Sequence, residues 1–201
     1  MLLHALIPAS RVNGPGLRCV VFFQGCDLGC GRCWNPRSHR FEGPEETVDA
    51  VVNQILRAHA ELALEGVTFS GGEPMEQAYS LLALIRKLRS HVPQLSFGIF
   101  SGYSERELDG GQYRIWHREF EVQEKRGLWE AICAHLDFAV LGRFNQHQPS
   151  TLPLRTSRNQ VLRLFSGRYT AADFDEQSVE VSICEDGRAE LTGFPVSGLP
   201  W

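Results

Sequence analysis

The segment FFQGCDLGCGRCWN, residues 22–35, places three of the chain's six cysteines within eight positions. Cys26, Cys30 and Cys33 have the spacing C-x3-C-x2-C. The glycines beside them are Gly25, Gly29 and Gly31. Because glycine has no Cβ, the backbone between the cysteines can fold tightly and turn all three sulfurs inward. Three thiols on one short loop indicate a redox motif, a metal ion or an iron–sulfur cluster.

These three alternatives need different numbers of ligands. A redox pair uses two cysteines and leaves the third unexplained. A tetrahedral zinc ion needs a fourth ligand, and His39 is the nearby candidate. A [4Fe–4S] cluster normally has four cysteine ligands, so with three of them one iron stays open to bind another molecule. The spacing favours the cluster over zinc and leaves both open. The remaining cysteines lie in apolar runs and are predicted to be buried core residues: Cys19, Cys133 and Cys184.

A second short motif, SGGEP at residues 70–74, has the composition of a cation-binding turn. Gly71 and Gly72 allow the backbone to approach a ligand closely, and their carbonyls can accept hydrogen bonds from an ammonium group. Glu73 can add negative charge, and Pro74 suits the first position of a following helix. By itself the motif could equally be an ordinary strand-to-helix turn.

The elements that must position these motifs alternate along the chain. Short apolar runs predict strands at residues 18–24, 67–70, 95–100 and 137–144. Helical spacing of apolar residues follows them at 44–66, from Pro74 to Leu88, after SGY at 101–103, and at 128–136. Strands alternating with helices predict βαβ units and a parallel sheet.

Ligands of parallel sheets bind beyond the carboxyl ends of the strands. The cysteine loop, SGGEP and SGY each follow one of the predicted strands. We therefore expect the three loops to meet in space. Tyr103 is expected either to pack at the rim of that site or to contact the ligand.

The later part of the chain has a different pattern. Residues 110–127 are polar and irregular and are expected to form an insertion with little structure of its own. Its charged stretch, 109–126, would be a solvated face or a loop that docks a partner. Residues 178–194 alternate on both sides of Asp186-Gly187 and predict a C-terminal β-hairpin. We expect one domain over 1–201, with a core of about 17–165 and a β extension over 166–201.

Composition excludes several classes of protein. The 201 residues carry a net charge of −4, with the positive charges scattered, so nucleic acid is not an expected partner. No apolar run approaches the ~20 residues that cross a bilayer, and the start of the chain lacks the positive charge of a secretory signal. We expect a cytoplasmic protein, in which clustered cysteines bind metal or catalyse rather than form disulfides.

Together, C-x3-C-x2-C after the first strand and SGGEP after the second resemble the radical S-adenosylmethionine (SAM) superfamily. Four segments more specifically resemble the activating proteins of anaerobic (class III) ribonucleotide reductases and, more broadly, the activases of glycyl-radical enzymes. They are NGPGLRCVVFFQGCDLGCGRCWNP, GVTFSGGEPMEQ, GIFSGY and LPLRTSRNQVLRLFSGRY. The resemblance covers most of the chain, and the cysteine motif is specific only jointly with GGEP.

The resemblance implies a partial (incomplete) α/β barrel and a [4Fe–4S] cluster bound by Cys26, Cys30 and Cys33. SAM would chelate the open iron and be cleaved after transfer of one electron, giving methionine and a 5′-deoxyadenosyl radical. Gly72 would contact SAM, with Gly71 and Glu73 in the same loop. Backbone atoms of Arg32, Cys33 and Trp34 would face the nucleoside. On this basis a Gly72 substitution is expected to weaken SAM binding and to leave the iron content intact.

Three positions differ from what the resemblance leads one to expect. Arg32 stands where many members have an aromatic residue, and Trp34 follows the last cysteine instead. Asn13 replaces the aspartate of the N-terminal motif and removes its charge. Thr156 stands where glycine is usual. Asn159 and Gln160, beside the late strand, could reach the ribose or the partner, or be structural.

The implied activity is transfer of the radical to a glycine of a partner protein. An incomplete barrel has an open side that a partner's extended loop could enter and seal from water. The implied partner is the large subunit of anaerobic ribonucleotide reductase, with a flavodoxin or ferredoxin as electron donor. Two other functions stay open: a radical SAM enzyme acting on a small molecule or peptide, and a non-enzymatic iron–sulfur or zinc module.

Overall fold

The computed structural model describes residues 1–117, 119–174, 178–183 and 189–194. It contains a six-stranded sheet in which the strands lie in their chain order. The strands are β1 (Leu3–Ser10), β2 (Arg18–Phe23), β3 (Gly66–Gly71), β4 (Ser96–Ser101), β5 (Phe138–Leu141) and β6 (Val161–Leu164). β2 to β5 run parallel, while β1 and β6 pair antiparallel at the two edges. The prediction of a mixed α/β fold with a mainly parallel sheet is confirmed.

The edge strand β1 was not predicted from the sequence. It pairs with β2, with Ile7 opposite Val20, and lies before the residue at which the core was expected to begin. Pro8 has no N–H and interrupts the apolar run LHALI, which makes the segment read as irregular. At the edge of a sheet one side of the backbone needs no partner, so proline is tolerated there.

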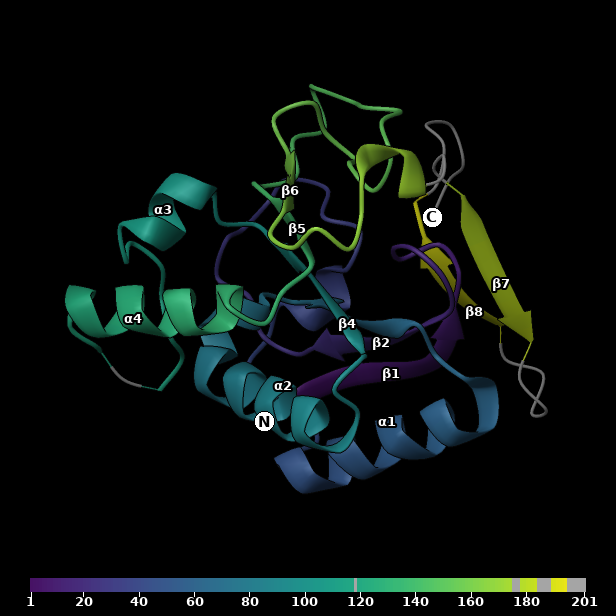
Figure 1. The fold of residues 1–201 in the computed structure, drawn as a ribbon. Coiled ribbons are helices and arrows are strands. Elements are labelled where there is room, and N and C mark those ends of the chain that lie inside the picture. The colour runs from purple at the N-terminus through teal and green to yellow at the C-terminus, as the bar shows by residue number, and fades with distance from the viewer. Residues whose placement is uncertain (118, 175–177, 184–188, 195–201) are drawn as a thin grey trace.

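Three longer helices lie along one face of the sheet, as Figure 1 shows: α1 (Val48–Leu62), α2 (Ala78–His91) and α4 (Val122–Cys133). α1 begins where Thr47 accepts a hydrogen bond from the Ala50 N–H at 3.1 Å. It ends at Ala63, which takes the left-handed conformation. The short helix α3 (Glu105–Asp109) begins with a capping box at Ser104. No helix in the described part of the chain is long and apolar enough to span a membrane.

The prediction of an irregular segment over 110–127 is wrong for its second half. α4 already begins at Val122, because the polar residues up to 127 lie on the solvent side of a helix that buries Leu128, Trp129 and Ile132. In the first half, residues 110–117 form no helix or strand but are packed, since Tyr113 and Ile115 are buried.

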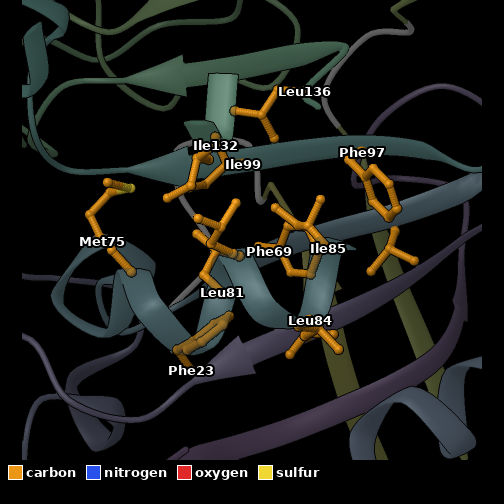
Figure 2. Close-up of a cluster of buried hydrophobic side chains, with 14 of the residues drawn as sticks. Phe23, Phe69, Met75, Leu81, Leu84, Ile85, Phe97, Ile99, Ile132 and Leu136 are labelled. Atoms are coloured by element: carbon orange, nitrogen blue, oxygen red, sulfur yellow. The ribbon is translucent and has the colours of Figure 1, made fainter. Parts of the chain in front are cut away.

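The main core lies between the helices and the sheet (Figure 2). Leu81, Leu84 and Ile85 of α2 pack against residues of the parallel strands and of α4. The buried partners labelled in Figure 2 include Phe23, Phe69, Phe97, Ile99 and Ile132. Burial of a side chain of this size contributes about 1.5–3 kcal/mol, so this layer holds the parallel strands in register.

A second, smaller hydrophobic cluster includes every other side chain of β5. Phe138 and Val140 pack with residues of the later chain: Leu154, Tyr169, Phe174 and Phe194. Ala139 and Leu141 instead belong to the main core. Since successive side chains of a strand point to opposite faces, the second cluster lies on the face away from the helices.

The last two strands, β7 (Val179–Ile183) and β8 (Ala189–Gly193), pair antiparallel in a sheet of their own. The turn predicted at Asp186-Gly187 lies outside the described residues. The described residues also form three short 3₁₀ helices: η1 (Pro36–Ser38), η2 (Pro74–Gln77) and η3 (Ala171–Asp173). Pro74 begins η2, so the predicted start of a helix after GGEP is confirmed.

Candidate functional site

A cavity of about 300 Å³ lies at the carboxyl ends of the parallel strands. Its floor is a row of side chains from β2 to β5 in which Phe22 pairs with Ser70, and Phe100 with Val140. These side chains alternate with those of the main core, so the cavity opens on the face without helices. The predicted meeting of the three loops is confirmed, because the cavity is lined by all three: Cys26, Cys30, Cys33, Gly71, Gly72, Glu73, Ser101 and Gly102.

The three cysteines are free thiols, and all of them are partly buried. The Cys26 N–H donates to the His39 carbonyl at 2.9 Å, and the Asn35 N–H donates to the Cys33 sulfur at 3.4 Å. Gly25 (φ 105°) and Gly29 (φ 61°) supply conformations that favour glycine. Gly31 does not, and Arg32 takes the left-handed conformation in its place (φ 55°). The loop is thus shaped by its glycines and backbone hydrogen bonds, together with the contact to the Cys33 sulfur.

The surroundings of the cysteine loop disfavour the ionised, thiolate form of its cysteines. Burial, with the nearby carboxylates of Glu73 and Glu76, raises the pKa of Cys26 to about 12. Burial also raises the pKa of Cys33. Since a cysteine binds metal as the thiolate, these sulfurs need a cationic centre beside them to ionise. An iron–sulfur cluster, bound by thiolates in a protected pocket, fits this donor set.

No three His, Cys, Asp or Glu side chains converge to bind one metal ion in the described part of the chain. His39 takes part in the loop through its backbone carbonyl. A cluster binds each cysteine through a different iron, so its ligands need not converge on one point. Of the other cysteines, Cys19 is fully buried as predicted and Cys133 only partly; nothing is described of the Cys184 side chain.

The GGEP loop is bonded directly to the cysteine loop. The Gly72 N–H donates to the Phe23 carbonyl at 2.7 Å, and the Glu73 N–H donates to the Gly25 carbonyl at 2.8 Å. A Cβ on Gly72 would overlap the Gly25 carbonyl and press on the Ser38 carbonyl. A side chain at this position would therefore displace the segment that carries Cys26. This geometry favours a loss of iron content on Gly72 substitution, in place of the expectation that the iron content stays intact.

The Glu73 carboxylate is buried and engaged in hydrogen bonds. It accepts from the Met75 N–H at 2.9 Å, from the Ser101 hydroxyl at 2.9 Å and from the Gly102 N–H at 2.7 Å. Burial raises its pKa to about 8, although these donors pull the pKa down. The side chain joins the loops after β3 and β4, which is a different role from that of a free charge for a ligand.

Glu76, which sequence reasoning did not single out, braces the cysteine loop. Its carboxylate accepts from the Asp27 N–H at 3.1 Å and from the Tyr103 hydroxyl at 3.0 Å. Tyr103 in turn accepts from the Arg114 N–H at 3.1 Å, and Arg114 forms an ion pair with Asp27. Burial raises the pKa of Glu76 to about 7. The one sequence feature that points to Glu76 is its position as an acidic residue in the first turn of a helix.

Tyr103 is buried and does not line the cavity, so of its two predicted roles the structure favours packing. Trp34 lines the cavity and stays 38% exposed, with its ring 5.6 Å from that of Phe144. Arg32 is exposed and does not line the cavity. Of the predicted nucleoside-facing residues, the structure therefore brings Cys33 and Trp34 to the cavity.

The positions flagged as departures also take part in the site. Asn13 is buried in the cavity wall, and its Nδ2 donates to the Ser10 and Thr192 hydroxyls at 2.8 and 2.9 Å. The Thr156 hydroxyl donates to the Gln160 Oε1 at 2.9 Å. Gln160 also lines the cavity but is held by backbone groups on both ends of its amide. The Asn159 amide donates to the Arg143 carbonyl at 2.8 Å, which is a structural contact.

The similarity of this chain to known proteins agrees with an iron–sulfur site at the three cysteines. The family described as 4Fe-4S single cluster domain matches residues 12–163. The chain is 29% identical to an anaerobic ribonucleoside-triphosphate reductase-activating protein of Vibrio cholerae, over 81% of this chain and 97% of that protein. It is 41% identical to a pyruvate formate-lyase-activating enzyme of Staphylococcus aureus, over 72% of this chain and 59% of that enzyme.

Among solved structures, QueE from Escherichia coli overlaps 51% of this chain and 52% of its own, with a TM-score of 0.38 and 18% identity. This overlap is too loose to support a conclusion. The family match spans the cysteine loop, the GGEP loop and all strands of the main sheet from β2 to β5. The resemblance to radical SAM activating proteins is confirmed, and the chain belongs to the family of 4Fe–4S single cluster domain proteins.

Proposed function

We propose that this protein is a radical SAM activating enzyme that generates a glycyl radical on anaerobic ribonucleoside-triphosphate reductase. The observation that carries the proposal is the single cavity in which the cysteine loop meets the GGEP loop and the turn after β4. The name of the Vibrio cholerae relative, which this chain matches almost from end to end, supports the choice of partner.

In this proposal Cys26, Cys30 and Cys33 would hold a [4Fe–4S] cluster, with one iron left without a protein ligand for SAM. When bound, the reduced cluster supplies the electron that splits SAM into methionine and a 5′-deoxyadenosyl radical. The protein holds the start of the cysteine loop, around Cys26, through hydrogen bonds to His39, Glu73 and Glu76. The chemistry belongs to the cofactors, and the chain supplies orientation and exclusion of water.

SAM would lie in the cavity along the GGEP loop. The backbone of Gly71 and Gly72 borders the cavity, so their carbonyls can accept hydrogen bonds from the amino group. Backbone atoms of Arg32, Cys33 and Trp34 would face the nucleoside. Glu73 contributes by fixing this loop to Ser101 and Gly102 rather than by direct charge.

The apolar floor of the cavity protects a reactive radical. Phe22, Phe100, Val140 and Phe144 line it and offer water no hydrogen-bonding partner. We infer that the six-stranded sheet is an incomplete barrel whose open side admits an extended glycine segment of the partner, which then excludes water. Reduction by a flavodoxin or ferredoxin in the cytoplasm would complete the cycle.

The first test asks whether the protein binds an iron–sulfur cluster through the three cysteines. Protein purified and reconstituted without oxygen should bind about four irons and four sulfides per chain. Single Cys→Ala changes at residues 26, 30 and 33 should abolish reductive SAM cleavage, whereas Cys133→Ala, a partly buried cysteine outside the cavity, should retain it. Zinc without sulfide after reconstitution would exclude a radical SAM enzyme and leave a zinc module.

The second test asks whether the anaerobic reductase is the protein that receives the radical. Reduced protein, SAM and the anaerobic reductase of the same organism should together give a glycyl-radical doublet in electron paramagnetic resonance. Omission of any one component should remove the signal. SAM cleavage without a glycyl radical on the reductase would instead favour a small molecule or peptide as substrate.

A further inference from the structure

The ribbon formed by β7 and β8 lies beyond the family domain, whose match ends at residue 163. Figure 1 shows it beside the main sheet, on the side away from α4. It nevertheless forms part of the wall of the cysteine cavity, through Leu191, Thr192, Gly193 and Phe194. An element outside the segment that the family matches thus borders the place where the reaction is proposed to occur.

One face of the ribbon is polar and is attached to the N-terminal loop. Glu180 and Thr192 lie opposite each other across the two strands. Glu180 accepts a hydrogen bond from the Arg11 N–H at 2.9 Å, and Thr192 accepts from the Asn13 amide at 2.9 Å. Gly193 lies on the other face, in line with Leu191. A Cβ there would come within 2.7 Å of the Val12 side chain, so the N-terminal loop also packs against this end of the second face.

The end of the ribbon is anchored as well. Phe194 is buried in the second hydrophobic cluster, and its ring lies 5.6 Å from that of Phe100 on the cavity floor. The Phe194 N–H donates to the Ser178 carbonyl at 2.7 Å. Attachment along one face and at one end fixes which face the ribbon presents outward.

The outward face is apolar. Val181 lies directly opposite Leu191, and Ile183 is the next residue on the same face. These side chains are 60%, 50% and 80% exposed. Single exposed apolar residues are ordinary, but three adjacent ones on a two-stranded ribbon form a patch that indicates a binding surface. Leu191 also lines the cavity, so the patch is continuous with the cavity wall.

We propose that this apolar face, formed by Val181, Ile183 and Leu191, docks the extended segment of the partner that carries the target glycine. The inference rests on the proposed function. Continuity through Leu191 is the reason for this occupant: a segment that enters the cavity along this wall lies against the ribbon. In the described structure each ribbon strand pairs only with the other, so one backbone edge is also available to an extended chain.

The test uses the double variant Val181→Lys/Ile183→Lys of the whole protein, reconstituted and reduced without oxygen. Both residues lie outside the cavity lining. The KM for the anaerobic reductase in glycyl-radical formation should rise about tenfold or more, while iron content, partner-independent SAM cleavage and kcat stay unchanged. Val181→Thr/Ile183→Thr, which keeps β-branching, should raise the KM less and guards against disruption of the ribbon.

Val122→Lys is the matched control, since Val122 is 53% exposed and lies on α4, at the charged segment that could dock a partner instead. It should leave the KM unchanged. An unaltered KM in the double variant, or a rise only in Val122→Lys, overturns the docking surface. The docking surface is also overturned if the wild-type protein is a dimer and the double variant is a monomer with an unchanged KM. In that case a second copy of the chain covers this face. If the wild-type protein forms no glycyl radical at all, the proposed function fails as well, which is a different result.

Discussion

At the scale of single residues, the glycines of the two loops are not equivalent. Gly72 lies where the GGEP loop crosses the cysteine loop, and any Cβ there would overlap the Gly25 carbonyl. Gly31 lies within the cysteine loop, but a Cβ there would meet only the Gln146 amide, at 3.7 Å. The first glycine is required by a close backbone approach, and the second is not.

We therefore expect Gly72→Ala to lower both the iron content after reconstitution and the affinity for SAM, because the overlap shifts the segment that carries Cys26. Iron and sulfide analysis together with equilibrium SAM binding measures both quantities. Gly31→Ala should keep full iron content and SAM affinity. A Gly72→Ala protein with normal iron content and reduced SAM affinity would restore the simpler view that Gly72 acts on SAM alone.

At the scale of elements, α3 shows how a short helix is held in place. It has five residues and depends on its capping box, in which the Ser104 N–H donates to the Glu107 carboxylate at 2.8 Å. Arg143 donates to the same oxygen at 2.8 Å. The Arg143 hydrogen bond, together with those from Ser104, lowers the pKa of Glu107 to about 2.

Glu107→Gln should reduce the free energy of unfolding by about 1 kcal/mol at neutral pH. Because the folded pKa lies below the unfolded value of about 4.3, the ionised carboxylate stabilises the protein above that value. Its contribution is lost as the pH falls through about 2. Denaturant unfolding of both proteins across this range should therefore show their difference vanish toward low pH.

Glu105→Gln on the same helix is the matched control. Glu105 pairs with Arg163 on the surface, where the two side chains are 40% and 52% exposed. Its loss should therefore change the free energy of unfolding by less than about 0.5 kcal/mol. A Glu107 variant whose stability differs equally from the wild type at pH 7 and pH 2 would contradict the role of the charge.

At the scale of the whole molecule, Arg18 joins segments that are distant in the chain. Its fully buried guanidinium donates to the Pro15 carbonyl of the N-terminal loop, to Thr68 and Val67 of β3, and to Ser96 of β4. It also lies 5.1 Å from the centre of the Phe138 ring on β5. Burial lowers its pKa, so the hydrogen bonds and ring contact must offset the cost of a buried charge.

Arg18→Lys should lower the free energy of unfolding by about 3 kcal/mol, because an ammonium group cannot reproduce the planar set of donors and leaves buried acceptors unpaired. Equilibrium unfolding of the metal-free protein measures the loss. Arg86→Lys, on the exposed side of α2, should have no measurable effect. Equal stability of the two variants would show that Arg18 is not a central support of the sheet.

The sequence by itself determined the local features. The alternation of apolar runs predicted β2 to β5 and the helices between them, because the spacing of apolar residues reports which face of an element is buried. It also predicted the cysteine and GGEP loops and their meeting at one end of the sheet, since parallel strands end at the same edge. These inferences needed only neighbouring residues and one topological rule.

Tertiary structure decided what depends on contacts between distant residues. β1 exists because β2 offers it a partner, not because of its own pattern, which Pro8 interrupts. Glu76 braces the cysteine loop through Asp27, and Asn13 holds Thr192, across 49 and 179 positions of the chain. The orientation of a hydrogen-bonding side chain depends on which segments the fold brings beside it, and no local pattern of residues contains that information.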